Sequence, residues 1–304
     1  IMFEVKWIRD FNGHQGSVYS LSPTRKPLHF LSGGSDGKIV QWPVNSNADG
    51  SAIAMVDDVI FCMYYDVEHE YIFCGTQKGY LLRLDINLSA PPRKIVFHKF
   101  CIYQICKMAG YIFCTSADGI LSCFHPKTLE LLDAIKIGKN KIRAICPSKN
   151  EKDIFLSDDQ GQIFLYHIEE KKLELIHRIS SGKMVFSLLE LKPENHLIIS
   201  GMDALIRRFE LETGKEVEIP IKAHLFTVNK ICDLEPLPLL ASASRDRSIR
   251  FWDRNNLELV KDISRGKPNS HTHSVNDLCW ISEENILLSA SDDRLVKAWR
   301  INEI

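Results

Sequence analysis

Apolar and polar residues alternate along two neighbouring runs, Leu239–Ser244 and Ser248–Phe251. An Arg-Asp-Arg segment at 245–247 separates the two runs, and a Trp-Asp pair at 252–253 follows the second. Alternation with period two is typical of β-strands that bury one face, and a polar segment between two such runs indicates a turn. This part of the chain is therefore predicted to form two half-buried antiparallel strands.

The same unit recurs along the whole chain. Positions equivalent to Asp246 are spaced by 40 to 47 residues, and a large apolar residue follows each of them six positions later. The turn positions are Asp36, Lys78, Asp118, Gln160, Asp203, Asp246 and Asp293. The apolar positions are Trp42, Leu84, Phe124, Tyr166, Phe209, Trp252 and Trp299. Seven matches in one register indicate an internal repeat, and a period in this range is typical of propellers and solenoids.

These repeats resemble those of the WD40 family. The resemblance is carried by three segments, Gly13-His14…Asp36…Trp42, His224…Asp246…Trp252-Asp253 and His271…Asp293…Trp299. It extends over the whole chain and is strongest in the first unit and the last two. It implies an all-β fold, a seven-bladed β-propeller of four-stranded antiparallel blades.

The two ends of the chain indicate how this propeller closes. Residues 2–10, MFEVKWIRD, read as a strand that precedes the first unit, whereas the last unit ends at 299–301 without a fourth strand. We therefore expect the N-terminal strand to join the last blade, because this pairing covers an otherwise open sheet edge. Residues 1–304 are then expected to form one domain.

Composition narrows the classes of function. Lys and Arg number 38 against 39 Asp and Glu, a formal net charge of −1, which argues against a general nucleic-acid or membrane-binding surface. No apolar stretch approaches the roughly 20 residues that cross a bilayer, and no secretory pattern opens the chain. Most of the nine cysteines occupy apolar positions of the repeats. We expect buried free thiols and a reducing, cytoplasmic location.

His224, Ser242 and Asp246 are the residue types of a hydrolase triad. The family resemblance implies instead a structural tetrad in which His, Ser, Asp and Trp are hydrogen-bonded in a chain. The expected tetrads are His14, Ser32, Asp36, Trp42; His224, Ser242, Asp246, Trp252; and His271, Ser289, Asp293, Trp299. Three copies in one chain, and the lack of a GxSxG motif, favour the structural interpretation.

No enzyme activity, cofactor or metal is therefore expected. The chain has no CxxC pair, and the spacing of His271, His273 and Cys279 fits no common zinc pattern. The alternative is a propeller enzyme or small-molecule binder that uses the central channel. It would require carboxylates or histidines that converge at the starts of the inner strands, where Asn229, Asn276 and several aromatic residues stand instead.

Loops and strand ends are the expected binding surface of a propeller. Four residues follow the first apolar position of an inner strand, and four others lie in adjoining loops or turns. They are Tyr19, Tyr103, Arg143 and Phe186, and Met184, Met202, Phe226 and Arg245. Aromatic residues, Met and Arg are enriched in interface hot spots, although each could instead pack between blades. The sequence thus predicts a non-catalytic scaffold that binds a protein or peptide.

The sequence gives only one indication of the charge of the partner. Four lysines lie in three consecutive inter-blade loops, at Lys99, Lys139, Lys141 and Lys183. They could attract an acidic or phosphorylated segment, or form a solvated rim that nearby aspartates dilute. The propeller itself is expected to be a monomer, or a subunit of a larger complex.

Overall fold

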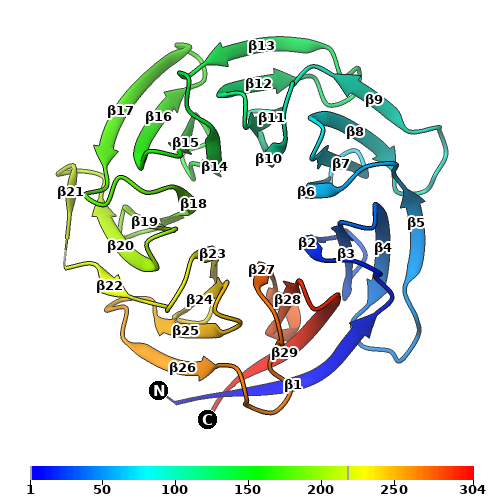
Figure 1. Cartoon of the computed structure of the whole chain (residues 1–304), viewed down its shortest axis with the longest axis vertical. Coiled ribbons are helices and arrows are strands. Elements are labelled where there is room, and N and C mark those ends of the chain that lie inside the picture. The colour runs from blue at the N-terminus through cyan, green and yellow to red at the C-terminus, as the bar shows by residue number, and fades with distance from the viewer. Residues whose placement is uncertain (1, 218) are drawn as a thin grey trace. The chain divides into compact units, whose positions relative to one another are not determined.

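The computed structural model describes residues 2–217 and 219–304, and its regular structure is almost entirely β-strand. The strands form seven antiparallel sheets, which confirms the predicted seven-bladed β-propeller (Figure 1). Six sheets are built from consecutive strands of the chain, and the seventh combines β1 with the last three strands. By their contacts the residues divide into two compact units, one formed by the segment up to Ile60 together with His224–Ile304, the other by Phe61–Ala223. Blades 1, 6 and 7 belong to the first unit and blades 2 to 5 to the second.

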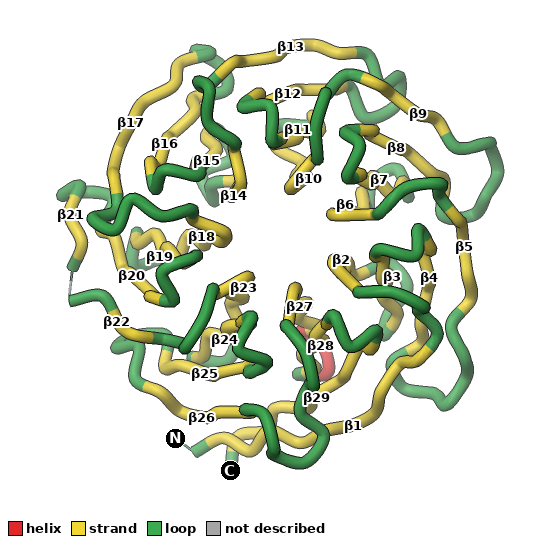
Figure 2. Tube along the Cα trace, viewed as in Figure 1, coloured by secondary structure: helices red, strands yellow, loops and turns green. Residues whose placement is uncertain are grey.

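Each blade is numbered by its order in the chain. In blades 1 to 6 the inner strand is the first strand of the sheet in chain order, and in blade 7 it is the strand at the edge opposite β1 (Figure 2). The inner strands are β2 (Val18–Pro23), β6 (Ile60–Asp66), β10 (Ile102–Met108), β14 (Ile142–Pro147), β18 (Val185–Leu191), β23 (Val228–Asp233) and β27 (Val275–Ile281). The second strands are β3 (His29–Gly34), β7 (Tyr71–Thr76), β11 (Tyr111–Ser116), β15 (Asp153–Asp158), β19 (His196–Gly201), β24 (Leu239–Ser244) and β28 (Ile286–Ser291).

The third strands carry the large apolar residue of the repeat. They are β4 (Lys38–Pro43), β8 (Tyr80–Asp85), β12 (Ile120–Phe124), β16 (Gln162–His167), β20 (Leu205–Glu210), β25 (Ile249–Asp253) and β29 (Leu295–Glu303). All seven of these residues are buried, from Trp42 to Trp299. Because they recur at one position of every blade, they explain why the repeat is visible in the sequence.

The outer strands differ most between blades. They are β5 (Ser51–Met55), β9 (Arg93–Val96), β13 (Leu131–Lys136), β17 (Lys172–Arg178), β26 (Leu259–Ile263) and, in blade 7, β1 (Phe3–Asn12). In blade 5 two short strands, β21 (Lys215–Glu216) and β22 (Ile221–Lys222), pair with different parts of β20. One short 3-10 helix, η1 (Ser282–Glu284), links β27 to β28.

Blade 7 is assembled from both ends of the chain, as the sequence predicts. Strand β1 pairs antiparallel with β29, from Phe3 opposite Glu303 to Asn12 opposite Leu295, with one register shift between Trp7 and Arg9. The two ends of the chain therefore lie side by side (Figure 1). Near the end of β1, Phe11 is buried against the rings of Phe30 and Trp42, with centroids 4.9 and 5.6 Å away.

The second strands are more deeply buried than their alternating pattern suggests. Every residue of β24 and of β28 is buried, so the expectation of a half-buried strand at 239–244 is wrong. The physical reason is that both faces of such a strand are covered. On one face Ala241 and Ala243 pack with Leu287 and Trp299 of blade 7, and small residues make this close approach feasible. The alternation reflects residue size and hydroxyl placement rather than exposure.

Candidate interaction site

Blade 6 contains a complete hydrogen-bonded tetrad. Trp252 Nε1 donates to Ser242 Oγ at 2.8 Å, and the same oxygen lies 2.7 Å from His224 Nε2. His224 Nδ1 lies 3.0 Å from Asp246 Oδ2. An indole N–H can only donate, so the serine accepts from Trp252 and donates to His224, whose Nδ1 proton then points to the carboxylate. The chain of bonds ties the loop before β23 to β24 and β25.

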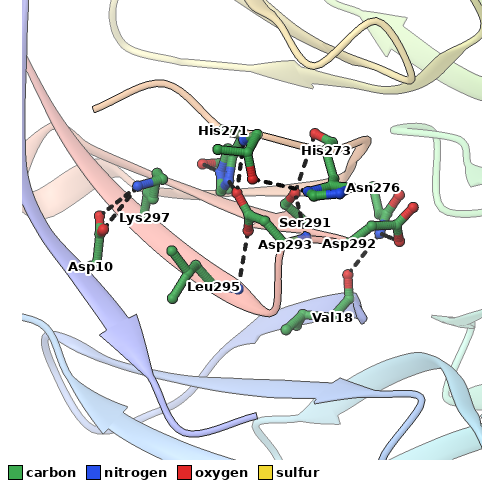
Figure 3. A network of polar contacts seen from close by, with 12 residues as sticks. Asp10, Val18, His271, His273, Asn276, Ser291, Asp292, Asp293, Leu295 and Lys297 are labelled. Atoms are coloured by element: carbon green, nitrogen blue, oxygen red, sulfur yellow. Dashed lines mark hydrogen bonds and ion pairs between the residues drawn. The ribbon is translucent and has the colours of Figure 1, made fainter. Parts of the chain in front are cut away.

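Blades 1 and 7 repeat this geometry. In blade 1 the Trp–Ser, Ser–His and His–Asp distances are 2.8, 2.7 and 3.0 Å, for Trp42, Ser32, His14 and Asp36. In blade 7 the same three distances are 3.0, 2.8 and 2.8 Å, for Trp299, Ser289, His271 and Asp293. Figure 3 shows His271 and Asp293 of the blade 7 set; Asp293 also accepts from the Leu295 amide. The serine of each tetrad is fully buried and bonded on both sides. These residues therefore hold the blades together and are not accessible to a substrate.

The surroundings of the tetrad aspartates favour the charged carboxylate. Burial alone would raise the pKa of Asp246, but hydrogen bonds from His224, Ser248 and the Leu225 amide hold that pKa below its usual value. The pKa values of Asp36 and Asp293 are lowered in the same way, against the effect of burial. A carboxyl whose pKa is lower in the folded than in the unfolded chain adds stability that is complete only above the unfolded pKa.

Substitution Asp246→Asn tests this stabilisation through its pH dependence. The unfolded carboxyl titrates near pH 3.9, so we expect the variant to be less stable than the wild type above about pH 5. The difference in unfolding free energy should shrink as the pH falls through about 4 towards the lowered pKa of Asp246. Urea unfolding of both proteins at pH 7, 5, 4 and 3 measures it. A difference that stays constant over this range would contradict the assignment.

Blade 3 contains an altered tetrad that the sequence analysis missed. His98 Nδ1 lies 3.0 Å from Asp118 Oδ2, and His98 Nε2 lies 2.7 Å from Ser122 Oγ. Ser122 belongs to β12, whereas the serines of blades 1, 6 and 7 belong to the second strand. The usual serine position is taken by Cys114, which lies directly opposite Ser122 in the sheet. The hydroxyl is thus supplied by the neighbouring strand.

Blades 4 and 5 stabilise the same turn with other side chains. In blade 4 Asn140 Nδ2 donates to the buried carboxylate of Asp158 at 2.8 Å. In blade 5 Asp203 accepts from Ser181 Oγ and pairs with the buried Arg207, both at 2.7 Å. The loop–carboxylate bond is therefore kept in blades where the histidine is missing.

A second recurring feature lies at the start of the inner strands. In six of them the ladder register shifts at the second residue, which marks a β-bulge. The bulged residues are Tyr19, Tyr103, Arg143, Phe186, Asn229 and Asn276. A bulge leaves one residue unpaired and changes the direction of its side chain. The four binding residues predicted at these positions, Tyr19, Tyr103, Arg143 and Phe186, therefore all occupy a β-bulge.

Three of these residues meet in the unit Phe61–Ala223. The guanidinium carbon of Arg143 lies 4.5 Å from the ring centroid of Tyr103, 4.6 Å from that of Phe186 and 5.2 Å from that of Phe61. These distances fall within the range of cation–π attraction. Tyr103 also meets Phe61 edge to face at 5.7 Å. We call Phe61, Tyr103, Arg143 and Phe186 the Arg143 cluster; all four side chains are partly exposed.

The guanidinium of Arg143 lies beside three aromatic rings. Burial lowers the pKa of its guanidinium, but an arginine stays protonated in proteins. Within the described residues, no carboxylate forms an ion pair with it. The cluster therefore offers apolar ring surface next to a cation whose counter-charge is left to a ligand or to solvent.

The other predicted partner-binding residues are not part of this cluster. Tyr19 belongs to blade 1, in the other unit. Met184 and Met202 lie next to each other, since the Met202 amide donates to the Met184 carbonyl at 2.9 Å. Phe226 and Arg245 are exposed and line one pocket of blade 6.

The bulged asparagines have a structural role. Asn276 Nδ2 donates to the Val18 carbonyl of blade 1 at 3.0 Å and to Asp292 at 2.8 Å (Figure 3). Asn229 Nδ2 donates to the Val275 carbonyl of blade 7 at 2.8 Å. Bulged residues therefore tie neighbouring blades together in blades 6, 7 and 1, and in blades 3 to 5 they form the Arg143 cluster together with Phe61 of blade 2.

Comparison with known proteins agrees with these details. Residues 5–43, 215–253 and 264–300 match the family described as WD40: WD domain, G-beta repeat, and these segments hold the three complete tetrads. The chain is also similar to the crystal structure of the WD40 beta propeller domain of Doa1, with a TM-score of 0.84 and 17% identity over 98% of this chain and 97% of that one. The chain is a β-propeller that carries WD40 repeats in these three segments.

The WD40 propeller also has a curated relative. It is 22% identical over 213 residues to the U3 small nucleolar RNA-associated protein 15 homolog of Gallus gallus. The match covers 68% of this chain and 40% of the relative. The chain thus spans about two fifths of the length of that protein.

Residue spacing in the sequence could have identified two further site residues, Phe61 of the Arg143 cluster and His98 of the blade 3 tetrad. Phe61 follows Ile60, the first apolar residue of β6, at the same offset as Tyr103 follows Ile102. His98 lies 20 residues before Asp118, whereas the histidines of complete tetrads lie 22 before their aspartates. The shorter offset and the displaced serine hid this tetrad.

Among the described residues of the WD40 propeller, Asp66, Glu68 and His69 bring three possible metal ligands within 4.8 Å of one another. Lys107 Nζ donates to Asp66 at 2.7 Å and to Glu68 at 2.6 Å, so an ammonium already neutralises this group. In the described parts of the chain, no helix is long and apolar enough to cross a membrane.

Proposed function

We propose that this WD40 propeller is a non-catalytic scaffold that binds a protein or peptide through the Arg143 cluster. The observation that carries the proposal is the convergence of three partly exposed aromatic side chains on a guanidinium without a carboxylate partner. Aromatic residues and Arg dominate the binding energy of interfaces when they gather in one patch. A partner segment with an acceptor for Arg143 and an apolar group for the rings fits this surface.

Two further points support a scaffold. The triad-like residues of blades 1, 6 and 7 are buried and hydrogen-bonded to one another, so their role is structural. The similarity to a protein named as U3 small nucleolar RNA-associated favours a subunit of a larger assembly over an isolated monomer. The cytoplasmic location remains a prediction.

The double substitution Tyr103→Ala/Arg143→Ala tests the site. Proteins captured from a native lysate by the wild type should be reduced at least tenfold with the variant, because a hot-spot pair of this kind contributes 2 kcal/mol or more to binding. Loss of the cation–π contacts should cost about 1 to 2 kcal/mol of stability. Quantitative mass spectrometry of the captured proteins, with a thermal melt of each variant, measures both effects.

Tyr111→Ala is the matched control. Tyr111 is an exposed aromatic residue of the same blade, but it lies opposite Met108 at the other end of β10 and β11. It should leave the captured proteins unchanged. Equal capture by the wild type and the double variant would refute the proposal. A stability loss above about 4 kcal/mol in the double variant would assign the cluster to the core instead.

A further inference from the structure

Four arginines line one pocket of blade 6. The pocket has a volume of about 620 Å³ and is lined by residues of the loop that enters β23, the β24–β25 turn and the loop that leaves β26. Figure 2 shows the course of these segments. The loops supply Leu225, Phe226 and Arg265, and the turn and β25 supply Arg245, Arg247 and Arg250. All of these residues belong to the unit that contains blades 6, 7 and 1, whereas the Arg143 cluster belongs to the other unit.

The positive charge of this pocket is poorly compensated. Arg250 Nε lies 3.3 Å from Asp262, but Arg245, Arg247 and Arg265 form no ion pair with any described residue. The one carboxylate in the lining is that of Asp246, which is already bonded to His224 and to Ser248. Three guanidinium groups thus face the pocket without a counter-charge.

The turn position of Arg247 allows its side chain to be tested. Its φ is 76°, and the equivalent turn residues of blades 1 to 4 are Gly37, Gly79, Gly119 and Gly161, with φ between 72° and 88°. Glycine adopts this left-handed conformation freely, whereas a residue with a Cβ atom is disfavoured there. Blades 5 and 7 place Ala204 and Arg294 at this position, with φ of 65° and 72°. Glycine would therefore fit the turn at 247 without strain, and the Arg247 side chain can be removed without disturbing the backbone.

We propose that this pocket binds a phosphorylated residue of a partner peptide. A phosphate group carries a charge near −2 and three acceptor oxygens, which match several unpaired guanidinium groups better than a single carboxylate does. Beside the arginines, Leu225 and Phe226 are 71% and 60% exposed and offer apolar surface to a neighbouring side chain of the peptide. The chain as a whole has a net charge of −1, whereas nucleic acid needs an extended basic surface.

The test uses the whole chain and a pool of fluorescent nonapeptides with a central phosphoserine and degenerate flanks. By fluorescence anisotropy the wild type should bind this pool at least tenfold more tightly than the same pool with serine, and inorganic phosphate should compete. Arg247→Gly should weaken binding about tenfold or more, because a charge-assisted contact is lost. The same change relieves the turn, so the melting temperature should stay unchanged or rise.

Arg294→Gly is the matched control. Arg294 takes the equivalent turn position of blade 7, with φ of 72°, and does not line the pocket. Arg294→Gly should leave phosphopeptide binding unchanged. Tyr103→Ala/Arg143→Ala should also leave it unchanged, so the experiment tests the blade 6 pocket independently of the Arg143 cluster. Equal affinity for the two peptide pools, or equal binding by Arg247→Gly and Arg294→Gly, would overturn the proposal. So would tighter binding of a single-stranded RNA oligonucleotide that Arg247→Gly abolishes.

Discussion

Deletion of residues 1–12 should prevent stable folding of blade 7. The deletion removes β1 and leaves β29 as an open edge along its whole length. It also removes Phe11, which is 1% exposed and packs against Phe30 and Trp42; loss of such a side chain alone costs about 3 to 5 kcal/mol. Lys297, whose side chain is 5% exposed, loses its ion pair with Asp10 at 2.9 Å. The combined loss is comparable to the whole stability of a typical domain.

Thermal unfolding followed by circular dichroism measures this effect, and the deleted protein should melt far below the wild type or show no cooperative transition. Adding the missing segment as a synthetic peptide should restore part of the lost stability. Phe11→Ala should cost about 3 to 5 kcal/mol, whereas Lys6→Ala, an exposed position of the same strand, should stay within about 0.5 kcal/mol. A deleted protein that melts like the wild type would show that β1 is dispensable for the fold.

His224→Ala should give the second large effect. The imidazole is buried and bridges Ser242 and Asp246, so its removal leaves a cavity and two buried polar groups with fewer partners. Unmet hydrogen bonds of this type cost about 1 to 3 kcal/mol each, and we expect a loss of about 3 kcal/mol in unfolding free energy. Urea unfolding at pH 7 gives the value.

The control for this substitution is His273→Ala. His273 is exposed and lies two residues after His271, in the loop that enters the inner strand of blade 7. Its removal should change stability by no more than about 0.5 kcal/mol. If the two variants unfold at the same urea concentration, the buried tetrad of blade 6 does not contribute to stability as its geometry suggests.

The fold was predictable because its repeat depends on single positions. The apolar residue six places after each turn is buried in every blade, so its spacing alone reveals the number and register of the blades. Closure by the N-terminal strand was predictable for a similar reason, since the last unit lacks a fourth strand. The depth of burial of the second strands could not be predicted from the sequence, because the alternating pattern of β24 and β28 does not show that a second blade covers their other face.

The candidate sites were predictable only in part. A fixed offset from the start of the inner strand identifies Tyr103, Arg143 and Phe186. The same offset also selects Asn276, whose side chain donates a hydrogen bond to the backbone of a neighbouring blade. Whether a bulged side chain meets another or bonds to backbone depends on the adjacent blades, which one repeat does not encode. The blade 6 pocket joins Phe226 and Arg245 with Arg265, some twenty residues later, and only the folded loops bring them together.

The pairing of β1 with β29 also sets the order of events during synthesis. The segment Phe3–Asn12 leaves the ribosome long before its partner strand, which is complete only after Glu303 has been added. At about 5 to 20 residues per second, this takes roughly 15 to 60 seconds. Throughout that time an apolar strand that includes Phe11 has no sheet to join. The nascent chain thus presents a ready binding segment for a molecular chaperone until the last residues of blade 7 emerge.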